Sequence, residues 1–374
     1  MSYCKLLAVV SCVTFAACAG RFSPVAPPSG GLSVSVGADG FPGPSAVPAG
    51  DYAVIASTDV SGAERVFARL PAVSPELRTA LLAQRRLLER QDLNREYVVG
   101  GRTVAGRHFL EVIDRLLDAP HPFVPEAIPV ARRGEVHFTG YFSPDLPASR
   151  VRTPRFRYPL LRAPEVDSLR RRTRAQIGTG EAFDLGTHAL AWVEHPLDVY
   201  LMQLQGSGYV TYRDGTRRYL GFGGSNGRPL TPIARALAES THGVSHRGIL
   251  AIRAWMSEDL PGRSAIIDAC ENYVYFEPAD TPPTGAAGVP LTAMVSVAAD
   301  PRHYPLGAVL LAEVPAPGNP RLRRTRILLV QDVGAAIKGR HRLDLYTGVG
   351  TGALDKARLT SAVGEVFVLA PQAS

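Results

Sequence analysis

Two stretches near the C-terminus decide the fold: residues 331–339, which read QDVGAAIKG, and residues 344–350, which read DLYTGVG. The apolar run 327–330 leads into the first stretch and predicts a strand that ends at Asp332. Gly334 follows among small residues, where the lack of a side chain lets the backbone turn sharply. An acid at the end of such a strand is a candidate site residue, and the alternative is that it only accepts backbone N–H bonds in the turn.

The second stretch predicts a strand with one polar face. Alternation places Leu343 and Leu345 on one side and Arg342, Asp344 and Tyr346 on the other. An acid beside a tyrosine on the open face of a strand suits a sugar-binding groove. The alternative is an ordinary ion pair between Asp344 and Arg342.

The composition is that of a globular protein with an excess of basic residues. Of the 374 residues, 45% are hydrophobic and 20% are charged, which is enough for one or two domains. With 41 basic and 34 acidic side chains the formal net charge is +7, which favours an anionic partner. No zinc-finger, RNA-recognition or helix-turn-helix signature is present, so we expect no nucleic-acid partner.

The N-terminus predicts export and a lipid anchor. Lys5 precedes an apolar run at residues 6–17, which is too short to span a bilayer and is typical of a signal peptide. Residues 15–18 read FAAC and resemble the bacterial lipobox, so Cys18 is the expected lipidation site. Ala19 replaces the aspartate that would hold such a protein at the inner membrane, and the resemblance therefore implies an outer-membrane protein that faces the periplasm. Plain secretion and a buried N-terminal helix are the alternatives.

The segment after the anchor is composed mainly of Gly, Pro, Ser, Ala and Val, and it predicts a flexible tether at residues 18–50. Once the signal peptide is removed and Cys18 is lipidated, only Cys270 remains, so no internal disulfide can form. Cys270 follows a mostly apolar run, and we interpret it as a small core residue rather than a nucleophile.

The hydrophobic patterns predict a mixture of helices and short strands. Ser74-Pro75 opens one helix, a second covers residues 109–117, and others begin after Pro232 and at Ile249. Asp214-Gly215 predicts a tight hairpin turn. Strands are expected at residues 137–141, 199–205, 209–212, 273–276, 308–311, 327–330 and 341–346. The pattern indicates an α+β protein rich in β structure, with a β-rich region inserted into a second domain.

From about residue 138 to 356, the order and spacing of several segments resemble the membrane-bound lytic murein transglycosylase A family. Two changes depart from the family pattern: Val333 and Ala335 stand where a threonine and a second glycine are usual, and one extra residue lies between Lys338 and Asp344. These changes bear on the role of Asp332 more than on the identity of Asp344. Besides the two C-terminal stretches, the matching segments are FTGYFSP (138–144), QLQGSG (203–208), GSNG (224–227), TPIAR (231–235), IRAW (252–255) and NYVYF (272–276).

The resemblance implies an α+β, β-rich fold in which a double-psi β-barrel domain, formed from both chain ends, carries an inserted β-barrel-like domain. The groove between the two domains is the expected catalytic site. The expected boundaries are a lipoprotein signal peptide at 1–17, a tether at 18–50, the discontinuous barrel domain at 51–136 and 231–374, and the inserted domain at 137–230.

The resemblance also implies a lyase, a peptidoglycan lytic exotransglycosylase. Such an enzyme cleaves the β-1,4 bond between N-acetylmuramic acid and N-acetylglucosamine without water, because the C6 hydroxyl of the muramic acid attacks its own anomeric carbon. Asp344 is then the catalytic acid and subsequently the base, with Asp332 as a nearby polar support. An aspartate in this role needs a raised pKa, which burial provides. The remaining expected substrate contacts are Thr139, Gly140, Tyr141, Gln205, Gly206, Ser207, Lys338, Tyr346 and Gly348.

Two other functions remain open on the sequence: a peptidoglycan hydrolase that uses Asp332 and Asp344 as a pair, and a glycan-binding lipoprotein without turnover. Cleavage from strand ends and internal cleavage are not distinguished. The nine histidines show no metal-ligand spacing, and the Gly-rich run 348–352 lacks the acidic residue of a dinucleotide site, so we expect neither metal nor cofactor. The expected partners are peptidoglycan strands, the membrane through the lipid anchor, and other proteins of cell-wall synthesis or lysis.

Overall fold

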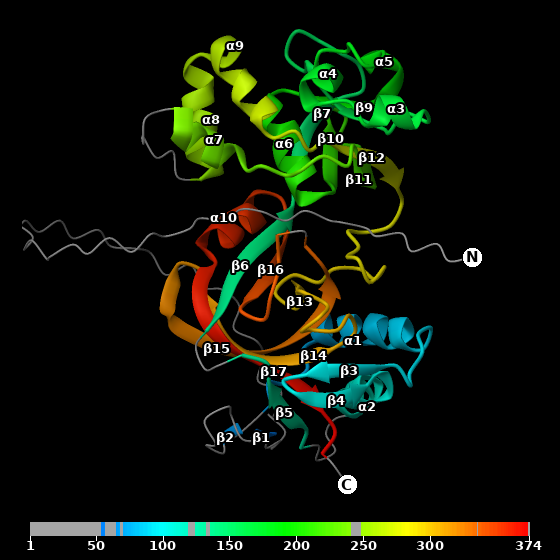
Figure 1. Cartoon of the computed structure of the whole chain (residues 1–374), viewed down its shortest axis with the longest axis vertical. Helices are drawn as coiled ribbons and strands as arrows, with labels where there is room; N and C mark the ends of the chain where they lie inside the picture. Colours follow the sequence, from blue (N-terminus) through cyan, green and yellow to red (C-terminus); the bar gives the residue numbers. More distant parts are fainter. Residues whose placement is uncertain are drawn as a thin grey trace, which may run out of the picture.

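The computed structural model describes residues 54–56, 65–67, 70–118, 124–131, 135–240, 248–334 and 336–372. The predicted signal peptide, the lipidation site Cys18 and the tether lie outside these residues. In Figure 1 the chain forms a lower, strand-rich body and an upper body that combines a sheet with several helices. Within the described part of the chain, no helix is both long and apolar enough to cross a membrane.

The lower body is built on a closed barrel of six strands. The strands pair in the order β14-β15-β13-β16-β6-β17, and a further pairing between β14 and β17 closes the ring. Alternate residues such as Phe138, Val297 and Leu345 are fully buried in the main core, which explains why these segments form strands. The bounds are β6 Val136–Ser143, β13 Ser296–Ala298, β14 Val309–Ala316, β15 Asn319–Asp332, β16 Arg342–Val349 and β17 Ser361–Ala370.

The ring brings together one strand from the middle of the chain and five from its C-terminal part. β6 pairs in parallel with β16 and antiparallel with β17. The barrel, together with the helices around it, confirms the α+β, β-rich class. Further strands extend the sheet beyond β17 or form a separate hairpin: β1 Val54–Ala56, β2 Arg65–Phe67 and β5 Glu126–Pro129 in the sheet, and β3 Glu96–Val99 with β4 Arg102–Ala105 as the hairpin.

Three helices pack on the barrel. α1 (Pro75–Leu88) begins where expected, because the Ser74 side chain accepts a bond from the backbone N–H of Leu77 and proline occupies the first turn. α2 (Gly106–Leu117) also confirms the sequence pattern, and its buried side chains Phe109 and Ile113 belong to the barrel core. α10 (Thr351–Leu359) lies against β6 and β16 (Figure 1).

The upper body contains an open sheet of six strands in the order β12-β11-β10-β7-β9-β8. The hairpin predicted at Asp214-Gly215 joins β10 to β11, and Gly215 has the positive φ of 81° that the turn requires. The bounds are β7 Asp145–Ser149, β8 Tyr158–Leu161, β9 Ala189–Val193, β10 Gly208–Tyr212, β11 Arg217–Ser225 and β12 Val274–Ala279.

The strand predicted at residues 199–205 is wrong, because this segment is the helix α6 (Pro196–Gln205). Nine of its ten residues are buried, so no polar stripe with helical spacing marks it in the sequence. The end signals were present: His195 caps the N-terminus, Pro196 occupies the first turn, and Gly206 ends the helix in the left-handed conformation at φ 80°. An apolar run of this length is ambiguous by periodicity alone.

The remaining helices cover the upper sheet and α6. α6, α7, α8 and the short 3₁₀ helix η1 share a core that includes Leu204, Leu237, Ile252 and the fully buried Cys270, as expected for a core cysteine. The bounds are α3 Asp167–Arg170, α4 Arg174–Gly178, α5 Leu185–His188, α7 Ile233–Ser240, α8 Ile249–Glu258, α9 Leu260–Arg263 and η1 Ser264–Ala269.

The strand pairings divide the chain at different points from the expected 137 and 230. Residues 136–143 form β6 and belong to the barrel, whereas residues 274–279 form β12 and pair with β11 in the upper sheet. The upper body therefore runs from about residue 144 to 279. At the first boundary β6 is separated from β7 by Pro144 alone, so no loop marks the passage from one body to the other.

Candidate active site

Two buried aspartates lie in one row across the barrel. Ala298 of β13 pairs with Asp332 of β15 on one side and with Asp344 of β16 on the other. Asp344 pairs in turn with Thr139 of β6. Paired residues of a sheet point to the same face, so both carboxyl groups and the Thr139 side chain project on one side. The two strand spacings between the aspartates place their Cα atoms about 10 Å apart.

Asp344 is held by the neighbouring strand. The Thr139 hydroxyl donates a hydrogen bond of 2.7 Å to Oδ1 of Asp344, and both residues are buried. A threonine at this position fixes the orientation of the carboxyl group through its β-branched, rotamer-restricted side chain. The structure therefore brings together two of the residues that the sequence predicted for the site.

Asp332 accepts three hydrogen bonds. The backbone N–H groups of Ala286 and Val333 each donate to Oδ1 at 2.9 Å, and the Tyr141 hydroxyl donates to Oδ2 at 2.9 Å. Burial, and to a smaller degree the charge of Asp344, raise the pKa of Asp332 to about 6 against the lowering effect of these bonds. Val333 replaces the family's threonine but still donates through its backbone.

Tyr141 and Tyr346 lie two residues beyond Thr139 and Asp344 on the same face, where they pair with each other. Their ring centroids are 5.2 Å apart. Burial raises the pKa of Tyr141 well above 10, and the charge of Asp332 adds to this increase, so its hydroxyl remains a donor. Burial likewise raises the pKa of Tyr346 to about 12, and its hydroxyl lies 2.9 Å from the Ser143 hydroxyl.

A cavity of about 280 Å³ opens beside these residues, between the barrel and the upper sheet. Asp332 and Tyr141 lie on its barrel side, and Gln205 lies at the end of α6 on the other side. Oε1 of Gln205 accepts a bond from the backbone N–H of Phe142, whereas its Nε2 is buried with no partner. An unsatisfied buried amide in a cavity wall is a donor available to a ligand. The other residues of the wall include Ser143, Gly206, Ser207, Tyr219, Gly221, Glu277, Thr281, Thr284, Gly285, Ala286 and Leu291.

Six of the predicted site residues do not line this cavity. Asp344, Thr139 and Tyr346 are buried on the barrel face beside it, and the other three lie elsewhere. Gly140 faces α10, where an added Cβ would lie 2.7 Å from the Cα of Ala357. Gly348 lies at an irregularity of β16 with φ 115°, and an added Cβ there would contact Ala293 and Ala353. Lys338 is exposed on the loop after Asp332 and does not line the cavity.

The sequence analysis missed the loop that covers Asp332 and the wall of the upper sheet. An added Cβ on Gly285 would lie 2.3 Å from the carbonyl oxygen of Gln331, so only glycine allows the loop to approach Asp332 this closely. In the sequence, the Pro/Gly-rich composition of residues 278–288 predicts a loop but not its position over Asp332. Tyr219 and Glu277 carry no local signal, because the strand register alone places them at the cavity.

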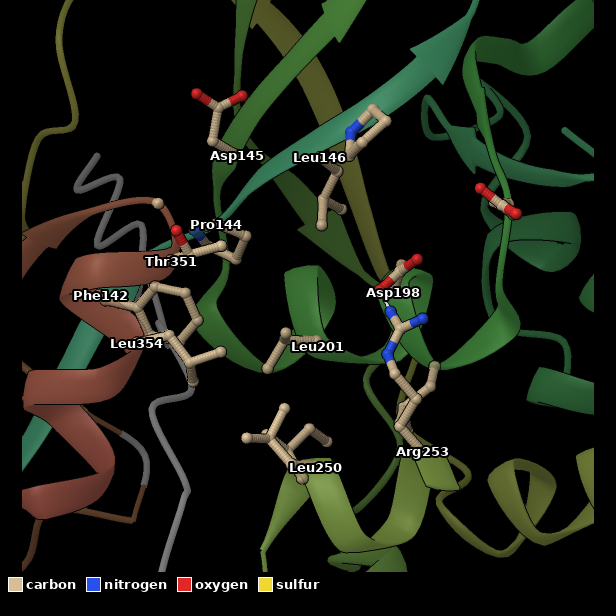
Figure 2. Close-up of a pocket in the computed structure, with 15 residues that line it drawn as sticks. Phe142, Pro144, Asp145, Leu146, Asp198, Leu201, Leu250, Arg253, Thr351 and Leu354 are labelled. Carbon is tan, nitrogen blue, oxygen red and sulfur yellow. Dashed lines mark hydrogen bonds and ion pairs between the residues drawn. The ribbon is translucent and has the colours of Figure 1, made fainter. Parts of the chain in front are cut away.

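A second cavity, of about 310 Å³, is lined by residues of β6, β7, α6, α8 and α10 (Figure 2). Phe142, Leu201 and Leu354 line it, and Arg253 forms an ion pair with Asp198 at its edge (Figure 2). Neither Asp332 nor Asp344 lines this cavity. The cavity that Asp332 lines is therefore the candidate active site.

Family models and curated proteins match the two bodies. The MltA specific insert domain matches residues 137–277, and the 3D domain matches residues 295–370. Membrane-bound lytic murein transglycosylase A of Escherichia coli K12 is 33% identical over 244 residues, which cover 63% of this chain and 66% of that protein. The Vibrio cholerae protein of the same name is 35% identical over 248 residues, which cover 64% of this chain and 66% of that protein.

Solved structures agree with these matches. The crystal structure of E. coli MltA with bound chitohexaose has a TM-score of 0.58 and 32% identity, and the match covers 64% of this chain and 72% of that one. The lytic transglycosylase LtgG of Burkholderia pseudomallei has a TM-score of 0.53 and 29% identity, with 79% and 89% of the two chains covered.

The fold and the site define a two-body β-barrel protein with two buried carboxyl groups, one of which lines a cavity between its bodies. The solved structures and curated proteins described above share this architecture. The chain belongs to the membrane-bound lytic murein transglycosylase A family.

Proposed function

We propose that this protein is a peptidoglycan lytic transglycosylase that cleaves the bond between N-acetylmuramic acid and N-acetylglucosamine and leaves a 1,6-anhydromuramoyl end. The observation that carries the proposal is the row of Asp332, Asp344 and Thr139 beside a cavity whose wall presents the unpaired amide of Gln205. A relative with 32% identity binds chitohexaose, which has the same β-1,4-linked backbone.

In this proposal Asp344 acts first as an acid and then as a base. Its proton passes to the glycosidic oxygen as the bond to the anomeric carbon breaks, and the resulting carboxylate takes the proton from the C6 hydroxyl as that oxygen bonds to the same carbon. The sugar supplies its own nucleophile, so no second carboxylate has to deliver water. The assignment of Asp344 follows its place in the family motif, and Thr139 orients it.

Asp332 supports the reaction as a fixed negative charge. With a pKa of about 6 it is mostly ionised at neutral pH, and its three hydrogen bonds hold it in place. An oriented carboxylate near the sugar stabilises the positive charge that develops on the ring in an oxocarbenium-like transition state. Gln205 is the proposed donor to an acetamido or hydroxyl oxygen of the substrate.

The test is to incubate the purified protein with peptidoglycan sacculi and to determine the masses of the released muropeptides. We expect 1,6-anhydro products, a loss of at least about a thousandfold in rate for Asp344→Asn, and a smaller loss for Asp332→Asn. Full activity of the Asp344→Asn protein, with its fold confirmed by circular dichroism, would refute the assignment.

A hydrolase that uses both aspartates is a second candidate function. The Cα separation of about 10 Å across Ala298 is compatible with the carboxyl separation of roughly 6.5–9.5 Å in inverting glycosidases. This function predicts products heavier by one water, in the same mass measurement. Binding to sacculi without any released product would instead indicate a glycan-binding protein.

We also propose that the protein is anchored to the outer membrane through Cys18 and faces the periplasm. The support is the FAAC sequence at residues 15–18 and the names of the relatives, which describe membrane-bound proteins. Metabolic labelling with a fatty-acid analogue should mark the wild-type protein but not Cys18→Ser. Other proteins of cell-wall synthesis or lysis are the proposed protein partners.

A further inference from the structure

One face of the upper sheet continues the wall of the candidate active site. In the strand registers Tyr209 of β10 pairs with Asp145 of β7 and with Tyr219 of β11, and Thr211 in the next row pairs with Arg217. These five residues therefore project on the same face. The alternate residues of the same strands, including Leu146, Val210 and Leu220, are buried in the core behind the sheet.

This face meets the cavity that contains Asp332. Tyr219 and Glu277 of the sheet line that cavity together with Ser143 and Asp332 of the barrel. The ring centroid of Tyr209 lies 5.1 Å from that of Tyr219, so the aromatic surface extends outward from the cavity. The charge of Arg217 reaches the barrel side of the groove, where it opposes the burial-driven increase in the pKa of Tyr346.

Arg217 is held in place on this face. Its guanidinium lies 3.7 Å above the centre of the Tyr209 ring, and its Nη2 forms an ion pair of 2.9 Å with Oδ2 of Asp145. The Thr211 hydroxyl donates to the other carboxylate oxygen of Asp145 at 2.7 Å. The Arg217 side chain remains 44% exposed, so a planar group with five N–H donors keeps some of them accessible to a ligand at little cost in side-chain entropy.

We infer that Arg217, stacked on Tyr209, is a subsite for a carboxylate group carried by the muramic acid residues of the glycan strand. This inference rests on the proposed function, because it assumes that the strand occupies the groove. Each muramic acid carries a lactyl group that ends either in a free carboxylate or in a peptide with its own carboxylates. A guanidinium binds such a group through two parallel hydrogen bonds, whereas the chitin backbone offers it no charged partner.

The test compares three ligands that share the same β-1,4 backbone. Chitohexaose has no carboxylate, strands freed of peptide carry lactyl carboxylates, and peptide-bearing strands carry peptide carboxylates. Affinity is measured by calorimetry with Asp344→Asn protein, which keeps the strands intact. We expect Arg217→Gln to lower the affinity for one or both carboxylate ligands about tenfold, because the loss of one exposed charge-assisted hydrogen bond costs roughly that much binding free energy. The affinity for chitohexaose should not change.

The helices of the upper body offer a matched control. Arg263 of α9 lies 4.9 Å from the centre of the Trp255 ring and forms an ion pair of 2.5 Å with Glu258. Because α9 lies at the end of the upper body away from the barrel (Figure 1), Arg263→Gln should change none of the three affinities. Arg217→Lys, which keeps the charge without the planar fork, should give an intermediate loss and serves as the second variant if Arg217→Gln does not fold.

The outcomes separate this inference from the proposed function. If Arg217→Gln loses affinity only for peptide-free strands, the recognised carboxylate belongs to the lactyl group. If it loses affinity only for peptide-bearing strands, the recognised carboxylate belongs to the peptide. Equal losses for all three ligands, or no loss for any of them, would overturn the inference, because Arg217 would then only brace the sheet. The proposed function fails on a different measurement, the absence of anhydro products from the wild-type protein.

Discussion

Replacement of Tyr141 by phenylalanine tests how far a single hydrogen bond lowers the pKa of Asp332. The Tyr141 hydroxyl donates to Oδ2 of Asp332 at 2.9 Å, and the tyrosine side chain is only 4% exposed. The substitution removes this donor and preserves the ring. Because the hydroxyl bonds the ionised carboxylate, its loss disfavours ionisation, and the pKa of Asp332 must rise.

The size of the rise in the pKa of Asp332 follows from the hydrogen bonds that its carboxylate loses and keeps. A hydrogen bond to a charged group contributes about 1.5–3 kcal/mol, and one pKa unit corresponds to about 1.4 kcal/mol. The two backbone donors from Ala286 and Val333 remain in the variant. We therefore expect the pKa of Asp332 to rise from about 6 by roughly one to two units, so that the group is at least half protonated at neutral pH.

The measurement is a pH titration of carboxyl-labelled aspartate by NMR, in which the Asp332 signal is identified by its absence from Asp332→Asn protein. Tyr346→Phe is the matched control, because its hydroxyl bonds Ser143 rather than a carboxylate. This control should shift the Asp332 midpoint by no more than a few tenths of a unit. An unchanged midpoint in Tyr141→Phe, or equal shifts in both variants, would refute the reasoning.

Three further predictions follow from contacts within the site and behind it. The raised pKa of Asp332 means that the folded protein binds this proton more tightly than the unfolded chain. Its contribution to stability is therefore full below about pH 4 and is lost as the pH rises through 6, a difference of about 3 kcal/mol. In urea unfolding, the free energy of unfolding should fall less between pH 4 and pH 7 for Asp332→Asn than for the wild-type protein. Thr139→Val removes the donor to Asp344 and should lower the rate of anhydro-product release by roughly tenfold or more, at a cost of about 1–3 kcal/mol in stability because a buried carboxyl oxygen loses its hydrogen bond, whereas an unchanged rate would contradict a positioning role. Gly140→Ala should cost about 1–3 kcal/mol in urea unfolding because its Cβ would overlap the backbone of α10, whereas Gly352→Ala, with open space around it, should cost nothing, and equal effects would contradict the packing argument.

The parts of the fold that could be predicted are those with a local physical signal. Ser74 and Pro75 mark the start of α1, and the Asp214-Gly215 turn marks the β10–β11 hairpin, because caps and tight turns depend on a few adjacent residues. The helix α6 was missed because it is buried on all sides and shows no amphipathic period.

The candidate site was predicted in part for the same reason. Asp332 and Asp344 stand out because each interrupts an apolar strand, and Thr139 belongs to a matching motif. Gly140 was included with its neighbour, but alternation along β6 turns it toward α10. The role of Tyr141 at Asp332 could not be predicted, since it depends on a contact between residues 191 positions apart.

The sequence by itself determined the class of fold, the family and the two acids of the site, because strand alternation, turn residues and motif order are all local properties of the chain. Only the tertiary structure decided which residues surround those acids. The closed order of the barrel strands sets Thr139 against Asp344, the loop at Gly285 brings a backbone donor to Asp332, and the register of the upper sheet places Arg217 beside Tyr209 and Asp145. These contacts depend on strand order and register, which arise from packing across the whole core and cannot be predicted from any single segment of the sequence.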